Sequence, residues 1–379
     1  MKFVTVRMIL GGSTLVSLLV ILALWPYRSY TRQRSLWGYE VHDFGRSPGA
    51  DYEVLYLGAL GGKHTVYHGG CISNGVVGVS INLPNRSEAY EPRPAIASYT
   101  VLPVNPQVLD IQDQHIGGIV YGINSQGQAT GVIGKNALYF SGGTVTALKP
   151  PPGFEKAEAR GINAGSVVAG FCDPSGEEAY LRQHATIWKS GTPTDIGVPE
   201  GCVSSRCNGI NDAGQIAITA ITKAKRTRSY RWQDGKFEDL GSLGGVATVA
   251  QAINNRGQIV GTSEVSPKIF HAFLWEEGAM VDLGSLSKNH TYVKATSINN
   301  KGEVVGWSGI GEGWNSTTRP FVWDKVNGMR DLTKLVGYMS PFQPRTAYSI
   351  DENGDILVYG YRKQFWNTVQ ALAILRKTP

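Results

Sequence analysis

The segment AINNRGQIVG at residues 252–261 decides the fold, because its pattern recurs along most of the chain. Its core, an Ile-Asn-x-x-Gly phrase before a short apolar run, returns at 123–127, 210–214 and 298–302, with looser copies at 72–75, 162–165 and 350–354. The anchoring isoleucines run from Ile72 to Ile350 at a mean spacing of about 46 residues, which is typical of four-stranded propeller blades.

Two further phrases follow each core phrase. The second ends in an aromatic residue and reads HATIW at 184–188, SYRW at 229–232, HAFLW at 271–275 and RPFVW at 319–323. The third opens on an aspartate, which is Asp195, Asp239, Asp282 or Asp331. Each unit therefore offers four short apolar segments separated by turn residues, which predicts a four-stranded antiparallel sheet.

The asparagine of the core phrase has a turn-forming role. Its side chain can hydrogen-bond its own backbone two residues on, and the glycine three positions after it supplies a positive φ. We therefore interpret these side chains as turn builders before ligand contacts: Asn124, Asn163, Asn211, Asn254 and Asn299.

The two ends of the repeat region predict how the fold closes. The last unit ends with its third strand at 370–375, while YLGALGG at 56–62 matches the fourth-strand phrase DLGSLGG at 239–245. Pairing 52–58 with 371–375 would leave no long exposed edge. The predicted fold class is all-β: a seven-bladed β-propeller of four-stranded blades, closed by an N-terminal strand that completes the last blade.

These phrases resemble the HAF-repeat family of extracellular repeats, whose name comes from the triplet seen here as His271, Ala272 and Phe273. The resemblance covers roughly residues 52–375 and rests on HAFLW, DLGSLGG and AINNRGQIVG together. The first unit departs from it by lacking the aromatic residue of the second phrase, and the last has Ile374 where Trp would stand. The resemblance implies an extracytoplasmic, propeller-like repeat protein and brings no catalytic residues with it.

Composition agrees with this class and excludes others. Of 379 residues, 47 are glycine and only 17% are charged, which does not suit a coiled coil or a helical bundle. The net charge is +6, but residues 1–34 hold five of the basic residues and no acidic one, so the remainder is nearly neutral. We therefore expect no nucleic-acid partner.

An apolar run from Met8 to Trp25 predicts an N-terminal membrane anchor, since 18 residues in a helix span roughly 27 Å. The run ends at a poor cleavage site, so we favour a retained anchor over a cleaved signal peptide or a buried core helix. Basic residues flank both ends equally, so the charge count does not set the orientation. The predicted organisation is an anchor at 1–34, a linker at 35–51 and a propeller at 52–379.

The loops that join the second and third strands share one face of a propeller. Here they vary in length, from four residues at 132–135 to 13 at 171–183, which marks a face that is free to carry function. The plainer alternative is that these are solvated loops. We expect this rim to bind a ligand through its charged and aromatic side chains, which are Arg86, Glu88, Arg93, Glu177, Glu178, Arg182, Glu312, Trp314, Arg362 and Trp366.

No motif indicates a cofactor, a metal site or a catalytic nucleophile. The four cysteines lack zinc-ligand spacing, and no Walker or Rossmann glycine pattern occurs. Cys202 and Cys207 are close enough in a loop to form a disulfide, given an oxidising compartment. His184 and His271 hold one repeated position, so we interpret them as structural.

The predicted function is a membrane-anchored, extracytoplasmic binding or scaffolding module, in the periplasm or at the cell surface, for an envelope glycan, peptide or protein. Cleavage and secretion is the alternative location. A hydrolase or lyase acting on extracellular glycans or lactones is the second function, and a structural adhesin is the third. An acid-rich channel mouth would favour the enzyme, a flat aromatic rim the binding module, and a featureless rim the adhesin.

Overall fold

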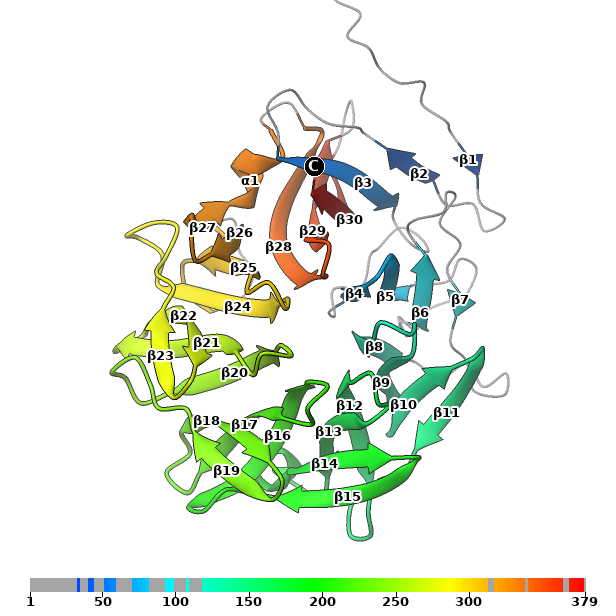
Figure 1. Cartoon of the computed structure of the whole chain (residues 1–379), viewed down its shortest axis with the longest axis vertical. Coiled ribbons are helices and arrows are strands. Elements are labelled where there is room, and N and C mark those ends of the chain that lie inside the picture. Colours follow the sequence, from blue (N-terminus) through cyan, green and yellow to red (C-terminus); the bar gives the residue numbers. More distant parts are fainter. Residues whose placement is uncertain are drawn as a thin grey trace, which may run out of the picture.

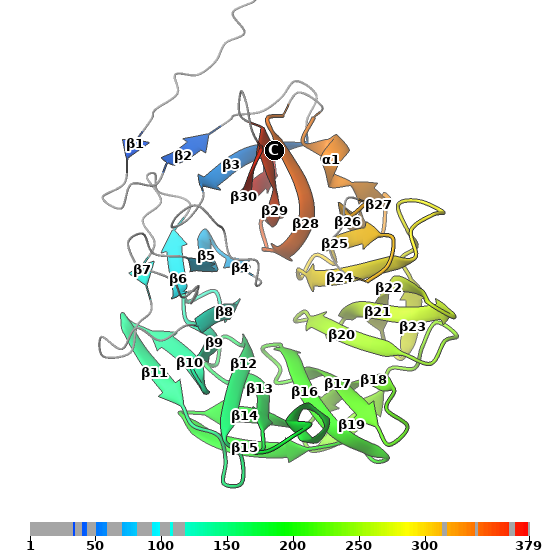
Figure 2. The ribbon, with the colours of Figure 1, turned by 180° about the vertical axis from the view of Figure 1, so that it is seen from behind.

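The computed structural model describes residues 33–34, 40–43, 51–58, 70–81, 93–98, 107–108, 118–312, 317–337, 340–363 and 368–377. These residues form an all-β, propeller-like fold in which small antiparallel sheets stand around a common axis (Figures 1 and 2). In each repeat unit the strand that ends at the core phrase is innermost, and later strands lie farther out.

Four sheets have four strands each. The first contains β4 (Cys71–Ser73), β5 (Val76–Ile81), β6 (Arg93–Ser98) and β7 (Gln107–Val108). The second contains β8 (Gly118–Ile123), β9 (Ala129–Ile133), β10 (Asn136–Ser141) and β11 (Thr144–Leu148). The third contains β12 (Lys156–Ile162), β13 (Val168–Asp173), β14 (His184–Lys189) and β15 (Thr192–Gly197), with the short helix η1 (Ala179–Arg182) before β14. The fourth contains β16 (Cys202–Ile210), β17 (Ile216–Thr222), β18 (Thr227–Gln233) and β19 (Lys236–Asp239).

Two sheets are larger. The eight-stranded sheet contains β20 (Thr248–Ile253), β21 (Ile259–Ser266), β22 (Ile269–Glu276), β23 (Ala279–Asp282), β24 (Tyr292–Ile298), β25 (Val304–Gly309), β26 (Arg319–Asp324) and β27 (Gly328–Asp331). The helix α1 (Leu332–Leu335) follows β27. The six-stranded sheet has the order β1 (Gln33–Arg34), β2 (Glu40–Asp43), β3 (Tyr52–Gly58), β30 (Thr368–Lys377), β29 (Ile356–Lys363) and β28 (Phe342–Ile350).

The predicted fold class therefore needs correction. The described residues do not form seven separate four-stranded blades closed by one N-terminal strand: they form six sheets, and none of these closes on itself. Two units merge because Phe270 of β22 pairs in parallel with Tyr292 of β24. The terminal sheet has six strands because β1 and β2 precede β3, which pairs antiparallel with β30 so that Val54 lies opposite Leu375.

The predicted transmembrane helix, at about 8–25, lies outside the described residues. Where the structure does describe the chain, no helix has both the length and the apolar character needed to cross a membrane.

The asparagines of the core phrase build the turns and also join the units. In the turn after β20, Oδ1 of Asn254 accepts hydrogen bonds from the backbone N–H groups of Arg256 (3.1 Å) and Gln258 (3.0 Å). Its Nδ2 donates to the backbone carbonyl oxygen of Asn299 in the next unit, at 2.9 Å. Side-chain-to-carbonyl bonds of 2.9–3.1 Å repeat from unit to unit in the series that we call the asparagine ladder: Asn124 to Asn163, Asn163 to Asn211, Asn211 to Asn254, Asn254 to Asn299 and Asn299 to Asp351.

Apolar side chains fill the spaces between neighbouring sheets. Trp188 and Trp275, the aromatic residues that end the second phrase, are each 1% exposed. The indole N–H of Trp188 donates to the backbone carbonyl of Lys149 in the preceding unit at 2.8 Å, so it does not go unpaired when it is buried. Phe273 packs with Trp275 against Ala217 and Leu240 of the unit before it. The second phrase therefore supplies the packing between units.

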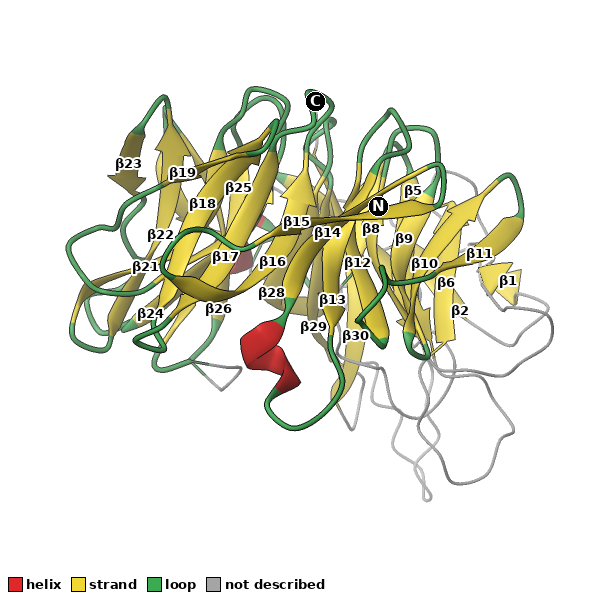
Figure 3. Cartoon of the chain, turned by 90° about the horizontal axis from the view of Figure 1, so that it is seen from below, coloured by secondary structure: helices red, strands yellow, loops and turns green. Residues whose placement is uncertain are grey.

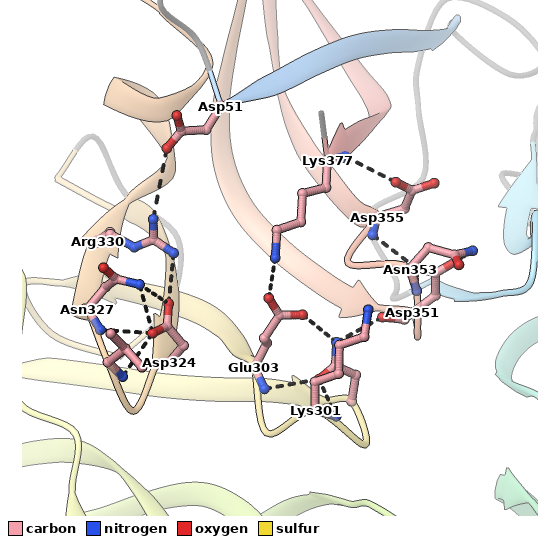
Figure 4. Close-up of polar contacts among 12 residues, drawn as sticks. Asp51, Lys301, Glu303, Asp324, Asn327, Arg330, Asp351, Asn353, Asp355 and Lys377 are labelled. Atoms are coloured by element: carbon pink, nitrogen blue, oxygen red, sulfur yellow. Dashed lines mark hydrogen bonds and ion pairs between the residues drawn. The ribbon is translucent and has the colours of Figure 1, made fainter. Parts of the chain in front are cut away.

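A group of ion pairs and hydrogen bonds fastens the C-terminal strand to the neighbouring unit (Figure 4). The ammonium of Lys377 lies 2.5 Å from Oε1 of Glu303, and the other carboxylate oxygen accepts a 2.7 Å bond from Asn299. The backbone N–H of Lys377 donates to Asp355 at 3.1 Å. We call this group the C-terminal clamp, and we assign it a structural role because every contact joins elements of the fold.

Candidate functional site

The inner strands share an irregularity at one position. Each of six inner strands has a register shift, which leaves one residue out of the pairing with the second strand. A β-bulge of this kind can re-aim a side chain, and bulges are common beside functional sites. In all six strands the residue two positions before the anchoring isoleucine is skipped, namely Tyr121, Arg160, Asn208, Gln251, Thr296 and Tyr348, and β16 and β28 have a second shift, at Val203 and Arg345.

Glycines on the second strands make room for these bulges. A Cβ atom at Gly170 would fall on the carbonyl oxygen of Glu158, and one at Gly306 would fall on that of Lys294. Any other residue would have to push the inner strand away, so the glycine of the Val-Ala-Gly and Val-Val-Gly runs permits the bulged geometry. The sequence pattern is thus tied to the direction of the inner side chains.

Charged side chains gather on three of these strands. Arg160 and Glu158 of β12 form an ion pair at 2.5 Å, and both are half-buried. The guanidinium of Arg160 lies 4.0 Å from the ring centroid of Tyr121, which belongs to the preceding unit. It also lies 5.6 Å from the ring of Phe171, and Arg206 of β16 lies 5.7 Å from the same ring.

Electrostatic interactions link these charges across units. Burial lowers the pKa of Lys294, the nearby carboxylate of Glu312 raises it, and the charge of Arg160 lowers it further. Burial also lowers the pKa of Arg206, and Arg160 again contributes. Arg160 is on β12 and Lys294 is on β24, three units later in the ring, so this electrostatic interaction runs between separate sheets (Figure 1).

We call Glu158, Arg160, Arg206 and Lys294 the axial cluster. It holds three cationic side chains and one carboxylate, so it carries a net positive charge. Guanidinium groups bind carboxylates and phosphates through paired N–H donors, and partial burial strengthens such contacts. The chemistry that fits this arrangement is recognition of an anionic ligand.

One member of the axial cluster, Lys294, lies near the start of its strand, β24. Strands alternate in direction, so the starts of the inner strands lie on the face that carries the connections between second and third strands. Figure 3 shows the β13–β14 connection, with η1, projecting from one face of the ring. Glu312 links rim and cluster: it interacts with Lys294 and accepts a 3.4 Å bond from the hydroxyl of Tyr292, whose ring stacks on Trp307 at 5.5 Å.

Other predicted rim residues have local roles or are not placed. Arg182 donates from Nη2 to the backbone carbonyls of Ser175 (2.9 Å) and Glu177 (3.3 Å), so it holds its own loop, and Glu178 precedes η1. Arg362 lies on β29, opposite Phe342. Arg93 begins β6, and its side chain lies outside what the structure describes, as do the residues Arg86, Glu88, Trp314 and Trp366.

The disulfide expected between Cys202 and Cys207 is not formed, and both residues are free, buried thiols. They lie on one strand, β16, where extended backbone advances about 3.3 Å per residue and so holds the two side chains apart. Cys202 instead contacts the hydroxyl of Tyr230 at 3.6 Å. Burial raises the pKa of the Cys207 thiol to about 12, which keeps it protonated.

The repeated histidines have the structural partner that their repetition suggested. Nδ1 of His184 lies 2.8 Å from Asp195, and Nδ1 of His271 lies 2.8 Å from Asp282, the aspartate of the third phrase in each case. Arginines hold the same position in two other units, where they pair with Asp239 at 2.9 Å and Asp331 at 3.1 Å. Within the parts of the chain that are described, no three His, Cys, Asp or Glu residues are grouped to hold a metal ion.

Sequence reasoning missed the axial cluster, although a signal was present. The skipped residues stand just before Gly-Ile, Ala-Ile or Ser-Ile in the core phrase, and they vary while their neighbours repeat. Had the core phrase been extended two residues toward the N-terminus, Arg160 would have been included as a candidate site residue. The bulge itself, which turns the side chain, leaves no pattern of period two that could be recognised.

No family model matches the chain, and no curated protein matches it. Among solved structures, it is similar to the β-propeller domain of the Trilobed protease from Pyrococcus furiosus, described as having an open velcro topology, with a TM-score of 0.53, 12% identity and coverage of 82% of this chain and 95% of that one. It is also similar to a prolyl endopeptidase (TM-score 0.53, 10% identity, 81% and 50% covered) and to the Pyrococcus horikoshii acylaminoacyl peptidase (TM-score 0.50, 14% identity, 79% and 51% covered). The chain spans about half the length of these two peptidases. At such identities the likeness concerns the fold alone, and that fold is propeller-like.

Proposed function

We propose that this chain is a binding module for a carboxylate-bearing ligand of the cell envelope, in the first place an acidic glycan. The observation that carries the proposal is the axial cluster, in which three half-buried cations come from the inner strands of three units and the charge of Arg160 lowers the pKa of both Arg206 and Lys294. Holding Arg160, Arg206 and Lys294 close together costs stability through repulsion and desolvation, and an anion would offset that cost.

The alternative of a glycan- or lactone-cleaving enzyme calls for an acid-rich axis. Glu158 is the single carboxylate of the axial cluster, and it is paired with Arg160 at 2.5 Å. General acid–base cleavage of glycans uses two carboxyl groups that flank the scissile bond. This is why we favour binding over catalysis.

We further propose that the module is extracytoplasmic, tethered by the apolar run at 8–25, and that it belongs with the HAF-repeat proteins that its phrases resemble. Protease treatment of intact cells, alongside membrane fractionation, tests the location. We expect digestion from outside or after opening of the outer envelope, with the protein in the membrane pellet. Protection that persists until the inner membrane is lysed would contradict this location.

Binding is tested with the full-length chain and immobilised polygalacturonate, a uronate polymer, with neutral dextran as the comparison. We expect retention on polygalacturonate that falls with added salt, because the contacts are ionic. Arg206→Gln and Lys294→Met should each weaken retention about tenfold, which corresponds to the loss of one charged hydrogen bond. Lys236→Gln, on the outer strand β19, is the matched control and should bind as the wild type does.

Three outcomes would overturn this proposal. Equal retention on dextran and polygalacturonate would show that charge is not recognised. An equal loss of retention on polygalacturonate in Lys236→Gln and Lys294→Met would show that any surface cation suffices. Retention on polyglutamate but not on polygalacturonate would make the ligand an acidic peptide and reject the glycan.

A further inference from the structure

A cavity of about 510 Å³ lies between the β23–β24 connection, β26, β27 and α1, and shares no residue with the axial cluster. We call it the side pocket. Basic side chains from four elements line it: His290 from the connection, Arg319 from β26, Arg330 from β27 and Lys334 from α1. A volume of this size is in the range of small-molecule sites, which are roughly 300–1,000 Å³.

The side pocket exists where the chain departs from its own repeat. The phrase DLGSL occurs at 239–243 and at 282–286. Two glycines follow the first copy, and the four residues Ser287 to His290 stand at the same place after the second, so the second connection is longer. The helix α1 is a second departure, since Asp239 and Asp282 are followed by Leu-Gly and Asp331 by a helical turn. Both departures line the side pocket. Insertions in repeat proteins map to loops, and these loops often form the binding face.

The imidazole of His290 is held with one nitrogen available to the side pocket. Its Nδ1 lies 2.7 Å from Oγ of Ser308, and that oxygen already accepts a 3.4 Å bond from the backbone N–H of Leu286. Oγ of Ser285 lies 3.4 Å from the same hydroxyl. In the tautomer in which Ser308 donates its proton to Nδ1, Nε2 carries the N–H and can donate to a ligand. Burial and the charge of Arg319 lower the pKa of His290, which agrees with a neutral ring.

Ion pairs fix the two arginines that line the side pocket. Arg319 pairs with Asp331 at 3.1 Å and is 52% exposed. Arg330 pairs through Nη2 with Asp324 at 2.8 Å and through Nη1 with Asp51 at 3.9 Å, so both ends of its guanidinium are held, and the oxyanion is assigned to the other three basic side chains. Asp331 in turn caps α1 by accepting a 2.8 Å bond from the backbone N–H of Thr333. This contact positions the helix that carries Lys334.

We propose that the side pocket binds a small organic phosphate or sulfate, with the oxyanion placed among His290, Arg319 and Lys334. Donors from separate elements surround a tetrahedral oxyanion, whose oxygens point in several directions, better than they surround a planar carboxylate. The cavity is larger than the anion alone requires, and Leu286, Met329 and Leu335 line the remainder with apolar surface for the organic group. This site goes beyond the proposed function, which concerns the axis.

The test is calorimetric titration of the full-length chain with inorganic phosphate, inorganic sulfate and acetate at constant ionic strength. We expect phosphate or sulfate to bind and acetate to bind at least tenfold more weakly. Arg319→Gln and Lys334→Met should each reduce the affinity for the bound oxyanion about tenfold. A preference between phosphate and sulfate tells which ester the side pocket takes.

Arg228→Gln is the matched control, because Arg228 holds the same repeat position as Arg319, pairs with its aspartate at 2.9 Å and is 54% exposed. It should bind phosphate and sulfate as the wild type does. Lys334→Met keeps the test valid if Arg319→Gln loosens α1, since Lys334 takes no part in the cap. Absence of oxyanion binding to the wild type, acetate binding as tight as that of phosphate and sulfate, or equal loss in Arg228→Gln would each overturn the proposal.

Discussion

Nδ2 of Asn254 donates a 2.9 Å hydrogen bond to the backbone carbonyl oxygen of Asn299, 45 residues later, and Asn254 is only 4% exposed. Replacement by Ala would strand that carbonyl and two turn N–H groups. We expect Asn254→Ala to lower the free energy of unfolding by about 1–3 kcal/mol, measured by urea denaturation. Asn255→Ala, at the exposed next position, should change it far less, because water can replace its bonds. Similar losses in both variants would argue against the asparagine ladder as a source of stability.

Gly170 and Gly209 form a pair that tests the bulges. A Cβ at Gly170 would meet the carbonyl oxygen of Glu158, whereas the nearest atom to a Cβ at Gly209 is 3.5 Å away, an ordinary contact. We expect Gly170→Ala to cost about 1–3 kcal/mol or more, as overpacking does, and Gly209→Ala to be nearly neutral. Denaturant midpoints of the two variants decide the matter, and equal midpoints would refute the steric argument.

The C-terminal clamp predicts a pH dependence. Burial alone would raise the pKa of Glu303, but hydrogen bonds from Lys377 and Asn299 outweigh it and hold the pKa below its ordinary value. A carboxyl whose pKa is lowered by folding stabilises the folded state above its unfolded-state pKa, about 4.3, and this stabilisation is lost as the pH falls through the folded value. The stability difference between wild type and Glu303→Gln should therefore shrink on acidification from pH 7 to pH 3.

The size of this effect should be under about 1 kcal/mol, because Lys377 is 43% exposed and its ion pair is screened by solvent. Glu352 provides the contrast, since burial raises its pKa and the sign is reversed. Melting temperatures of Glu303→Gln and Glu352→Gln, followed over the same pH range, should diverge in opposite directions. If the melting temperatures of both variants changed in the same direction with pH, the opposite pKa shifts assigned to Glu303 and Glu352 would be contradicted.

Lys294 predicts a trade-off between stability and binding. Its pKa is lowered chiefly by burial, so at neutral pH folding must desolvate a charged ammonium. We expect Lys294→Met to raise the unfolding free energy by about 1 kcal/mol while it weakens retention on polygalacturonate. Lys236→Met, on an exposed strand, should alter neither quantity. Loss of stability in Lys294→Met would show that the ammonium has a structural partner and no functional role.

Much of the strand order could be predicted because each local signal repeats. Each phrase marks the end of one strand: the turn residues of AINNRGQIVG, the aromatic end of HAFLW and the aspartate of DLGSL. A strand end that is unclear in one unit can be assigned from the other units. How strands join into sheets was not predictable in this way. The one parallel pair among the described strands, between Phe270 and Tyr292, merges two units, yet it depends on the path of one connection and not on any pattern.

The candidate site was harder to predict for a related physical reason. Rim residues such as Arg182 attract notice in a sequence because they are charged and lie in long loops. In the structure, however, the guanidinium of Arg182 donates hydrogen bonds to the backbone of its own loop. Arg160 and Lys294 lie within strands, where alternation suggests a side chain facing either a neighbour or the core. The bulge that takes Arg160 out of the pairing is a property of the backbone, which composition and spacing do not report, while Lys294 stays paired opposite Trp307.

The asparagine ladder also gives the order of the units a direction. Every rung has the same donor and acceptor, so a duplicated unit inserted anywhere before the last would find a matching neighbour on both sides. The series ends at Asp351, whose backbone carbonyl accepts the bond from Asn299, while its carboxylate side chain has no amide N–H for a further rung. A unit duplicated within the series would therefore keep its rungs, whereas a unit placed after Asp351 would begin without one.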